Sequence, residues 1–150
     1  MREAIQLSRE GMEGSHGGPF GCVIVKDDVI VGRGNNRVTS TCDPTAHGEI
    51  VAIREACGTL KTFNLAGCSL YTSCEPCPMC LAAIYWARID VIYYANTRVD
   101  AAGIGFDDEL IYREVALAIE HRSKTMKPLL REEALTVFEE WMKKEDRIHY

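Results

Sequence analysis

The sequence lacks the features of a membrane-inserted, exported or multidomain protein. No apolar run approaches the roughly 18 uncharged residues that a membrane-spanning helix needs. The first ten residues are charged rather than signal-like, so we expect a cytoplasmic protein that is not exported. Internal repeats, low-complexity segments and linkers are absent as well. With 150 residues and a hydrophobic fraction of 47%, we expect one globular domain, residues 1–150, with its own core.

Positive charge is also scarce. Seventeen basic residues stand against 22 acidic ones, for a net charge of -5, and the longest basic stretch is the pair Lys143 and Lys144. Proteins that bind nucleic acid usually carry a basic surface, because counterion release from the phosphates supplies much of their affinity. The charge balance therefore disfavours a large RNA or DNA partner.

The seven cysteines are an odd number, and three of them crowd into Cys74-Glu75-Pro76-Cys77-Pro78-Met79-Cys80. This spacing is too tight for several disulfides, and clustered thiols in a protein that is not exported more often bind a metal. The other four cysteines lie among apolar or small residues, so we expect them to be small buried side chains: Cys22, Cys42, Cys57 and Cys68.

Helical and strand patterns alternate along the chain. Residues 1–13 have helical apolar spacing, and residues 20–26 and 29–33 are β-branched runs joined at Asp27-Asp28, as in an antiparallel hairpin. We expect Asp43-Pro44 to start a helix that ends near residue 58, and Pro78 to start another through residue 87. Residues 69–73 and 90–95 are predicted strands. This alternation predicts an α/β sandwich with helices over a central sheet.

The stretch from Asp107 onward is more polar and mostly helical in pattern. Four apolar residues follow one another at helical spacing in its last predicted helix: Leu135, Phe138, Trp141 and Met142. We expect this stripe to serve as core or as a dimer contact rather than to bind a cofactor.

Residues suited to zinc chemistry occur at the start of two predicted helices, in His47-Gly48-Glu49 and in Pro76-Cys77-Pro78-Met79-Cys80. One imidazole and two thiolates make a three-ligand zinc site that leaves a fourth position for water. Glu49 follows the imidazole by two residues, where a carboxylate can move protons without binding the metal. The combination of His-x-Glu with Pro-Cys-x-x-Cys is the signature of zinc nucleobase deaminases.

The alternative is a structural zinc or a redox thiol pair. Cys74 supports this alternative, because a fourth thiolate would complete the coordination sphere and exclude water. We place Cys74 instead at the end of the preceding strand.

The wider sequence resembles the cytidine deaminase-fold proteins, which include tRNA adenosine deaminases, fungal-type cytosine deaminases and bacterial guanine deaminases. The resemblance covers nearly the whole chain and is strongest at Gly18-Pro19-Phe20-Gly21, Asn36, residues 43–47, 71–80 and 83–88. Within that set, residues 101–108, Ile111-Tyr112 and the aromatic final residue Tyr150 resemble the guanine deaminases most.

The resemblance implies a three-layer α/β/α sandwich with a central five-stranded mixed sheet, and a homodimer whose carboxy-terminal segment is exchanged between subunits. It implies zinc-dependent conversion of guanine to xanthine and ammonia. Carried over by motif position, the site residues would be the zinc ligands His47, Cys77 and Cys80, the proton shuttle Glu49, the base-binding residues Asn36, Asp108 and Tyr150, and the pocket residues Phe20 and Trp86.

Several alternatives stay open. Asn36 could shape a turn, and either Asp107 or Asp108 could cap a short helix instead of facing substrate. Gly48 stands where such proteins more often have alanine, which leaves the choice of base open. Cytosine or a related purine or triazine would use the same metal ligands, whereas adenosine in tRNA would need a more basic surface. A zinc-stabilised module without activity would leave Glu49 unexplained.

Overall fold

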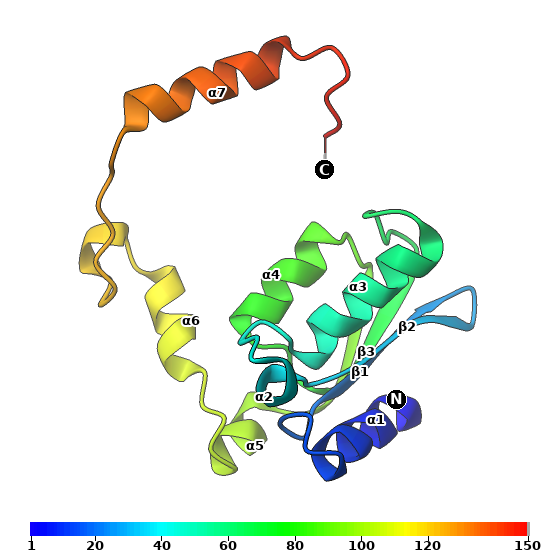
Figure 1. Cartoon of the computed structure of the whole chain (residues 1–150). Coiled ribbons are helices and arrows are strands. Elements are labelled where there is room, and N and C mark those ends of the chain that lie inside the picture. Colours follow the sequence, from blue (N-terminus) through cyan, green and yellow to red (C-terminus); the bar gives the residue numbers. More distant parts are fainter. Residues whose placement is uncertain (150) are drawn as a thin grey trace. The chain divides into compact units, whose positions relative to one another are not determined.

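Four β-strands form one mixed sheet in the computed structural model, which describes residues 1–149 (Figure 1). The strands are β1 (Gly21–Lys26), β2 (Val29–Asn35), β3 (Cys68–Cys74) and β4 (Val91–Asn96), in the spatial order β2-β1-β3-β4. β1 runs antiparallel to β2 and β3, and β3 runs parallel to β4. The predicted α/β class is confirmed, but the predicted number of five strands is wrong for the described residues.

A fifth strand is replaced by helix immediately after β4. Thr97 begins α5 (Arg98–Gly103) with a capping box: its hydroxyl accepts from the backbone N–H of Asp100, and the Asp100 carboxylate accepts from the backbone N–H of Thr97. No β-branched run comparable to those of β1 and β2 follows. β4 therefore lies at the edge of the sheet.

The predicted hairpin is confirmed. β1 and β2 are joined at Asp27 and Asp28, which both have left-handed backbone angles, with φ of 49° and 63°. Two consecutive residues of positive φ are typical of the tight turn that matches the twist of a two-stranded ribbon.

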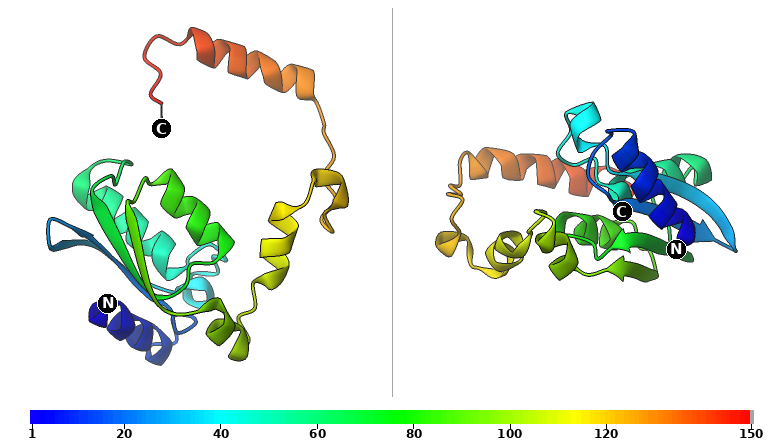
Figure 2. Two further views of the ribbon diagram at one scale, coloured as in Figure 1. Left: turned by 180° about the vertical axis from the view of Figure 1, so that it is seen from behind. Right: turned by 90° about the horizontal axis from the view of Figure 1, so that it is seen from below.

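Helices cover both faces of the sheet (Figures 1 and 2). α1 (Arg2–Glu13) covers the face toward which Gly21 points, because a Cβ there would meet the backbone of Ala4 at 2.3 Å. Side chains alternate along a strand, so Cys22 points to the opposite face. There it packs with side chains of α3 (Gly48–Leu60) and α4 (Pro78–Trp86), including Ala52 and Ile84. The helix α1, the sheet, and the pair α3 and α4 thus form three layers.

The buried core lies between the sheet and the pair α3 and α4. It consists of small and branched apolar side chains: Cys22, Ile24, Ala52, Ala56, Leu65, Cys68, Leu70, Ile84 and Ala87. At Gly34 on β2 a Cβ would lie 2.1 Å from the carbonyl oxygen of Gly48, the first residue of α3. The absence of a side chain at Gly34 thus lets the start of α3 lie directly on the sheet.

The prediction that Asp43-Pro44 starts a helix is wrong. The Asp43 carboxylate accepts hydrogen bonds from the backbone N–H and the hydroxyl of Thr45, which closes a turn, and α3 begins only at Gly48. His47 is therefore the N-cap of α3 and not a residue inside it. A short helix that the sequence did not predict, α2 (Val38–Thr41), precedes this turn, and its C-cap Cys42 is exposed, contrary to the expectation of burial.

The chain divides into two compact units, Met1–Glu109 and the residues from Leu110 onward. The single-domain expectation for residues 1–150 stays a prediction. The second unit contains most of α6 (Glu109–Ala116), the short helix η1 (Ile119–His121) and α7 (Arg131–Lys143), and neither α6 nor α7 has a buried residue. No helix among the described residues is long and apolar enough to cross a bilayer.

The apolar stripe of the last helix does not form a core. Phe138 and Met142 on α7 are 71% and 64% exposed, Trp141 is exposed as well, and only Leu135 is partly buried. The other expectation for this stripe, a dimer contact, stays a prediction.

Candidate metal centre

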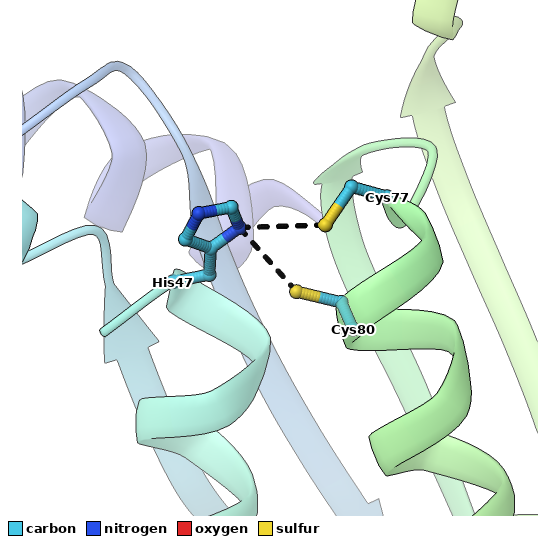
Figure 3. Close-up of side chains that lie close together, drawn as sticks. All are labelled: His47, Cys77 and Cys80. Carbon is cyan, nitrogen blue, oxygen red and sulfur yellow. Dashed lines mark hydrogen bonds between the residues drawn. The ribbon is translucent and has the colours of Figure 1, made fainter. Parts of the chain in front are cut away.

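Two helix N-termini meet beyond the carboxyl end of β3, one of the two inner strands of the sheet, and each carries a metal-binding side chain at its cap. His47 is the N-cap of α3, and Cys77 is the N-cap of α4, with Pro78 at the first helical position and Cys80 in the first turn. The imidazole of His47 makes no hydrogen bond to its own helix and points toward Cys77 and Cys80 at the start of α4 (Figure 3).

The three side chains have the spacing of ligands around one ion. The Nδ1 atom of His47 lies 3.6 Å from the Sγ atom of Cys77 and 3.5 Å from that of Cys80 (Figure 3). A tetrahedral zinc, with Zn–S of about 2.3 Å and Zn–N of about 2.0–2.1 Å, would separate nitrogen from sulfur by about 3.6 Å. One ring nitrogen has a single lone pair or a single proton, so two simultaneous sulfur contacts fit a shared cation better than two hydrogen bonds. The group therefore fits zinc.

The two thiols share a hydrogen bond that makes them unlike in acidity. The hydrogen bond from Cys80, together with one from His47, lowers the pKa of Cys77 to about 4, whereas the same contact with Cys77, and then burial, raise the pKa of Cys80. Cys77 is therefore the thiolate of the pair. The positive ends of the helix dipoles of α3 and α4 act in the same direction. A thiolate is the form of cysteine that binds metals.

Glu49 lies beside this group and is buried, with 6% of its surface exposed. Its Oε1 atom accepts a hydrogen bond from the hydroxyl of Thr72 at 3.0 Å, and its Oε2 atom lies 3.4 Å from the Sγ atom of Cys80. Burial raises the pKa of the Glu49 carboxyl above its ordinary value. A raised pKa brings a carboxyl closer to the pH at which it can both accept and donate a proton.

Cys74 stands apart from the cluster. It ends β3, as predicted, and its thiol donates to the carbonyl oxygen of Thr97 at 3.5 Å. Burial, and then the charge of Glu49, raise the pKa of Cys74 to about 11. Cys74 is thus a neutral thiol with a partner of its own, and among the described residues the ligand group contains only His47, Cys77 and Cys80.

Asn36 and Phe20 lie next to the start of α3. The backbone N–H of Asn36 donates to the carbonyl oxygen of Phe20 at 2.9 Å, and the neighbouring Arg37 N–H donates to the carbonyl oxygen of Ala46 at 2.8 Å. The Asn36 side chain is buried, and its Oδ1 atom accepts from the N–H of Val38 at 3.1 Å. The expected turn role is therefore present, and the amide nitrogen remains as the donor that Asn36 could offer a base.

The two adjacent aspartates differ in their surroundings. The exposed Asp107 uses Oδ1 to accept from the backbone N–H of Glu109 at 2.9 Å, which begins α6. Asp108 is partly buried; burial, and then the negative charge of Cys77, raise its carboxyl pKa. Asp107 thus supports the local turn, and the carboxyl of Asp108 responds to the charge of Cys77.

An aromatic pair that the sequence did not predict holds the segment before these aspartates. The rings of Phe20 and Phe106 meet edge to face, with centroids 4.9 Å apart and an interplanar angle of 88°. A Cβ at Gly18 would lie 2.9 Å from both rings, so glycine leaves room for the pair. Phe106 thereby packs the loop that contains Asp108 against Phe20, the residue that precedes β1.

Two candidate residues are not placed at the cluster. Trp86 is the last residue of α4, eight residues beyond the helix start, or roughly 12 Å along the axis, and is 67% exposed. Tyr150 lies outside the described residues. Their expected roles stay predictions.

Residues 1–96 match the family model for the cytidine and deoxycytidylate deaminase zinc-binding region. The chain is 49% identical to the guanine deaminase of Bacillus subtilis (strain 168) over 141 residues, which cover 94% of this chain and 90% of that protein. It is 44% identical to a tRNA-specific adenosine deaminase of Aquifex aeolicus, over 77 residues that cover 51% of each.

Two solved structures of guanine deaminases are also similar to this chain. The X-ray structure of the Bacillus subtilis guanine deaminase has a TM-score of 0.96 and 47% identity, covering 99% of this chain and 95% of that one. A guanine deaminase structure from Nitrosomonas europaea has a TM-score of 0.67 and 32% identity, covering 71% of this chain and 62% of that one.

Proposed function

The chain belongs to the cytidine and deoxycytidylate deaminase family, and we propose that it is a zinc-dependent enzyme that hydrolyses guanine to xanthine and ammonia. The resemblance expected from the sequence is confirmed by these comparisons. The observation that carries the proposal is the group of His47, Cys77 and Cys80 with ligand spacing beside the buried Glu49. Near-full-length similarity to a guanine deaminase supports the choice of base.

We assign His47, Cys77 and Cys80 as the zinc ligands and Glu49 as the catalytic residue. Zinc held there supplies Lewis-acid activation of the hydrolytic water. Glu49 accepts a proton from that water as its oxygen adds to C2, the ring carbon of guanine that bears the amino group. Glu49 then delivers this proton to the adjacent ring nitrogen. It next moves the second proton of the water, now on the added hydroxyl, to the leaving amine. Water and guanine thus give xanthine and ammonia.

We also propose Asp108, Asn36 and Phe20 as the residues that bind the base. Guanine offers N–H donors along its N1 and 2-amino edge, and the carboxylate of Asp108 is a matching acceptor. The amide nitrogen of Asn36 offers a donor to a ring acceptor, and the Phe20 ring, held by Phe106, gives the flat base an apolar surface. A base with the wrong donor pattern would leave a carboxylate unpaired, which is costly and therefore discriminates between bases.

We further propose a cytoplasmic homodimer in which the carboxy-terminal segment is exchanged, so that Tyr150 completes the partner's site. The exposed apolar stripe of α7, with Phe138 and Met142, supports a dimer contact because apolar side chains gain free energy when a partner covers them.

A panel of substrates tests the function. Ammonia release is measured with zinc-loaded protein and guanine, guanosine, cytosine, adenine or isoguanine at equal concentration. We expect guanine to react at least about tenfold faster than any other compound, with guanosine excluded by its ribose. If cytosine reacted fastest, the substrate would be a pyrimidine and not guanine. If the protein deaminated adenosine in a tRNA anticodon stem-loop but no free base, its activity would be that of a tRNA-specific adenosine deaminase, like the Aquifex aeolicus relative.

A further inference from the structure

The middle of β3 presents a hydroxyl to the carboxylate of Glu49. Thr72 lies 23 residues from Glu49 in the sequence, yet its Oγ1 atom donates to Oε1 of Glu49 at 3.0 Å. Both side chains are buried, Thr72 to 1% exposure and Glu49 to 6%. Thr72 pairs with Cys22 of β1, so it points to the sheet face that α3 covers, the face from which Glu49 approaches.

A buried carboxylate needs such a partner to hold one orientation. The last torsion of a glutamate side chain, between an sp³ and an sp² carbon, has broad wells, so packing alone leaves the plane of the carboxylate poorly fixed. A hydrogen bond to one oxygen fixes the plane and thereby directs the other oxygen. With Oε1 held by Thr72, Oε2 faces Cys80 of the ligand group.

The other side-chain contact of Glu49 cannot perform this task in the loaded enzyme. The Cys80 thiol lies 3.4 Å from Oε2, but a cysteine that binds zinc is a thiolate and has no proton to donate. Among the described residues, Thr72 is then the remaining side chain that the structure shows donating to Glu49.

We propose that Thr72 is a positioning residue for the deamination, whose hydroxyl holds Oε1 of Glu49 so that Oε2 is aimed at the water and the base. The proposal rests on the proposed function, because it assigns a partner to the proton shuttle of that reaction. Thr72 itself touches neither substrate nor metal.

The test compares two substitutions that separate the hydroxyl from the shape. Thr72→Val keeps the branched shape and removes the donor, whereas Thr72→Ser keeps the donor and removes a methyl group. We expect Thr72→Val to lower kcat by about tenfold or more, the scale of one hydrogen bond to a charged group. KM for the base and zinc content per chain stay within about threefold of the parent. Thr72→Ser retains kcat within about threefold. If Thr72→Val does not fold, Thr72→Ala replaces it as the variant without a donor.

Ser73 provides the matched control on the same strand. Its buried hydroxyl accepts from the backbone N–H of Gly21 at 2.9 Å, and as the neighbour of Thr72 on β3 it points to the opposite face of the sheet. Ser73→Ala therefore removes a buried hydroxyl from β3 and should lower the unfolding temperature without a comparable loss of kcat.

Three results would overturn the proposal: kcat of Thr72→Val within threefold of the parent, equal losses in Thr72→Val and Thr72→Ser, or a loss of zinc that parallels the loss of kcat. All variants are assayed with whichever base the parent deaminates fastest. A wrong assignment of guanine therefore leaves this test intact, since Glu49 moves protons for any of the bases in the panel.

Discussion

Replacing each of the two adjacent aspartates in turn tests which one selects the base. Asp108→Ala and Asp107→Ala remove the same charge and the same number of atoms one residue apart. Asp107 accepts from the backbone N–H of Glu109, whereas Asp108 is partly buried and within range of the charge on Cys77. We therefore expect Asp108→Ala to affect catalysis and Asp107→Ala to affect only the local turn.

The expected magnitudes follow from the hydrogen bonds that each variant loses. A hydrogen bond to a charged group is worth about 1.5–3 kcal/mol, which corresponds to roughly a 10- to 150-fold loss of kcat/KM for guanine in Asp108→Ala. The bond from Glu109 to Asp107 is exposed and contributes about 0.5–1.5 kcal/mol to the free energy of unfolding. Asp107→Ala should accordingly unfold at a slightly lower temperature with kcat/KM within about threefold of the parent.

The assay is the initial rate of xanthine formation over a range of guanine concentrations, with zinc content and thermal unfolding measured on the same samples. An Asp108→Ala enzyme within threefold of the parent, or equal losses in both variants, would refute the assignment of Asp108 as the residue that recognises guanine.

Three further changes separate the remaining roles. Cys77→Ala and Cys80→Ala should each lose zinc, measured by elemental analysis, because the two remaining ligands make a poor site, whereas Cys74→Ala should keep its zinc. If Cys74→Ala lost its zinc and the parent protein had no deaminase activity, the zinc would be structural. Glu49→Gln should keep zinc and lose turnover by about 10²–10⁴-fold, and near-parental turnover would remove Glu49 from the mechanism. Mixing inactive Glu49→Gln chains with chains that lack Tyr150 should restore partial activity if the tail is exchanged; no recovery after proven subunit exchange would count against the exchange.

The metal centre was predictable because its chemistry is local in sequence. Cys77 and Cys80 lie within one turn of a helix that Pro78 starts, and His47 precedes Glu49 by two residues at another helix start. Residue type and short spacing thus specify each half, and the structure brings the two halves within 4.8 Å of one another. The four β-branched or apolar runs in the sequence also correspond to β1 to β4. The fifth strand was taken from the resemblance alone and is not found among residues 1–149.

The start of α3 was mispredicted because two local structures share one signal. An aspartate that caps a helix and an aspartate that closes a turn both accept from a backbone N–H two or three residues later. Asp43 does so with Thr45, and the extended backbone of His47, with φ of -69° and ψ of 156°, shows that the helix starts afterwards.

Thr72 and Phe106 were missed because their contacts join distant parts of the chain. Thr72 meets Glu49 across 23 residues, and Phe106 meets Phe20 across a larger separation still. A weak signal for Thr72 was present: at a spacing of two residues it shares a face of β3 with Leu70 and Cys74, and Leu70 lies in the core beneath α3. No comparable pattern marks Phe106, since an aromatic residue in a loop does not indicate its partner.

The measurement that tests the central claim most directly is guanine turnover as zinc is returned to metal-free protein. Zinc content, xanthine and ammonia are measured on each sample of the titration. We expect turnover to rise in proportion to bound zinc and to level off at about one zinc per chain, with xanthine and ammonia formed in equal amounts. Full turnover by the metal-free protein, or no xanthine from protein that holds its full complement of zinc, would contradict a zinc-dependent guanine deaminase.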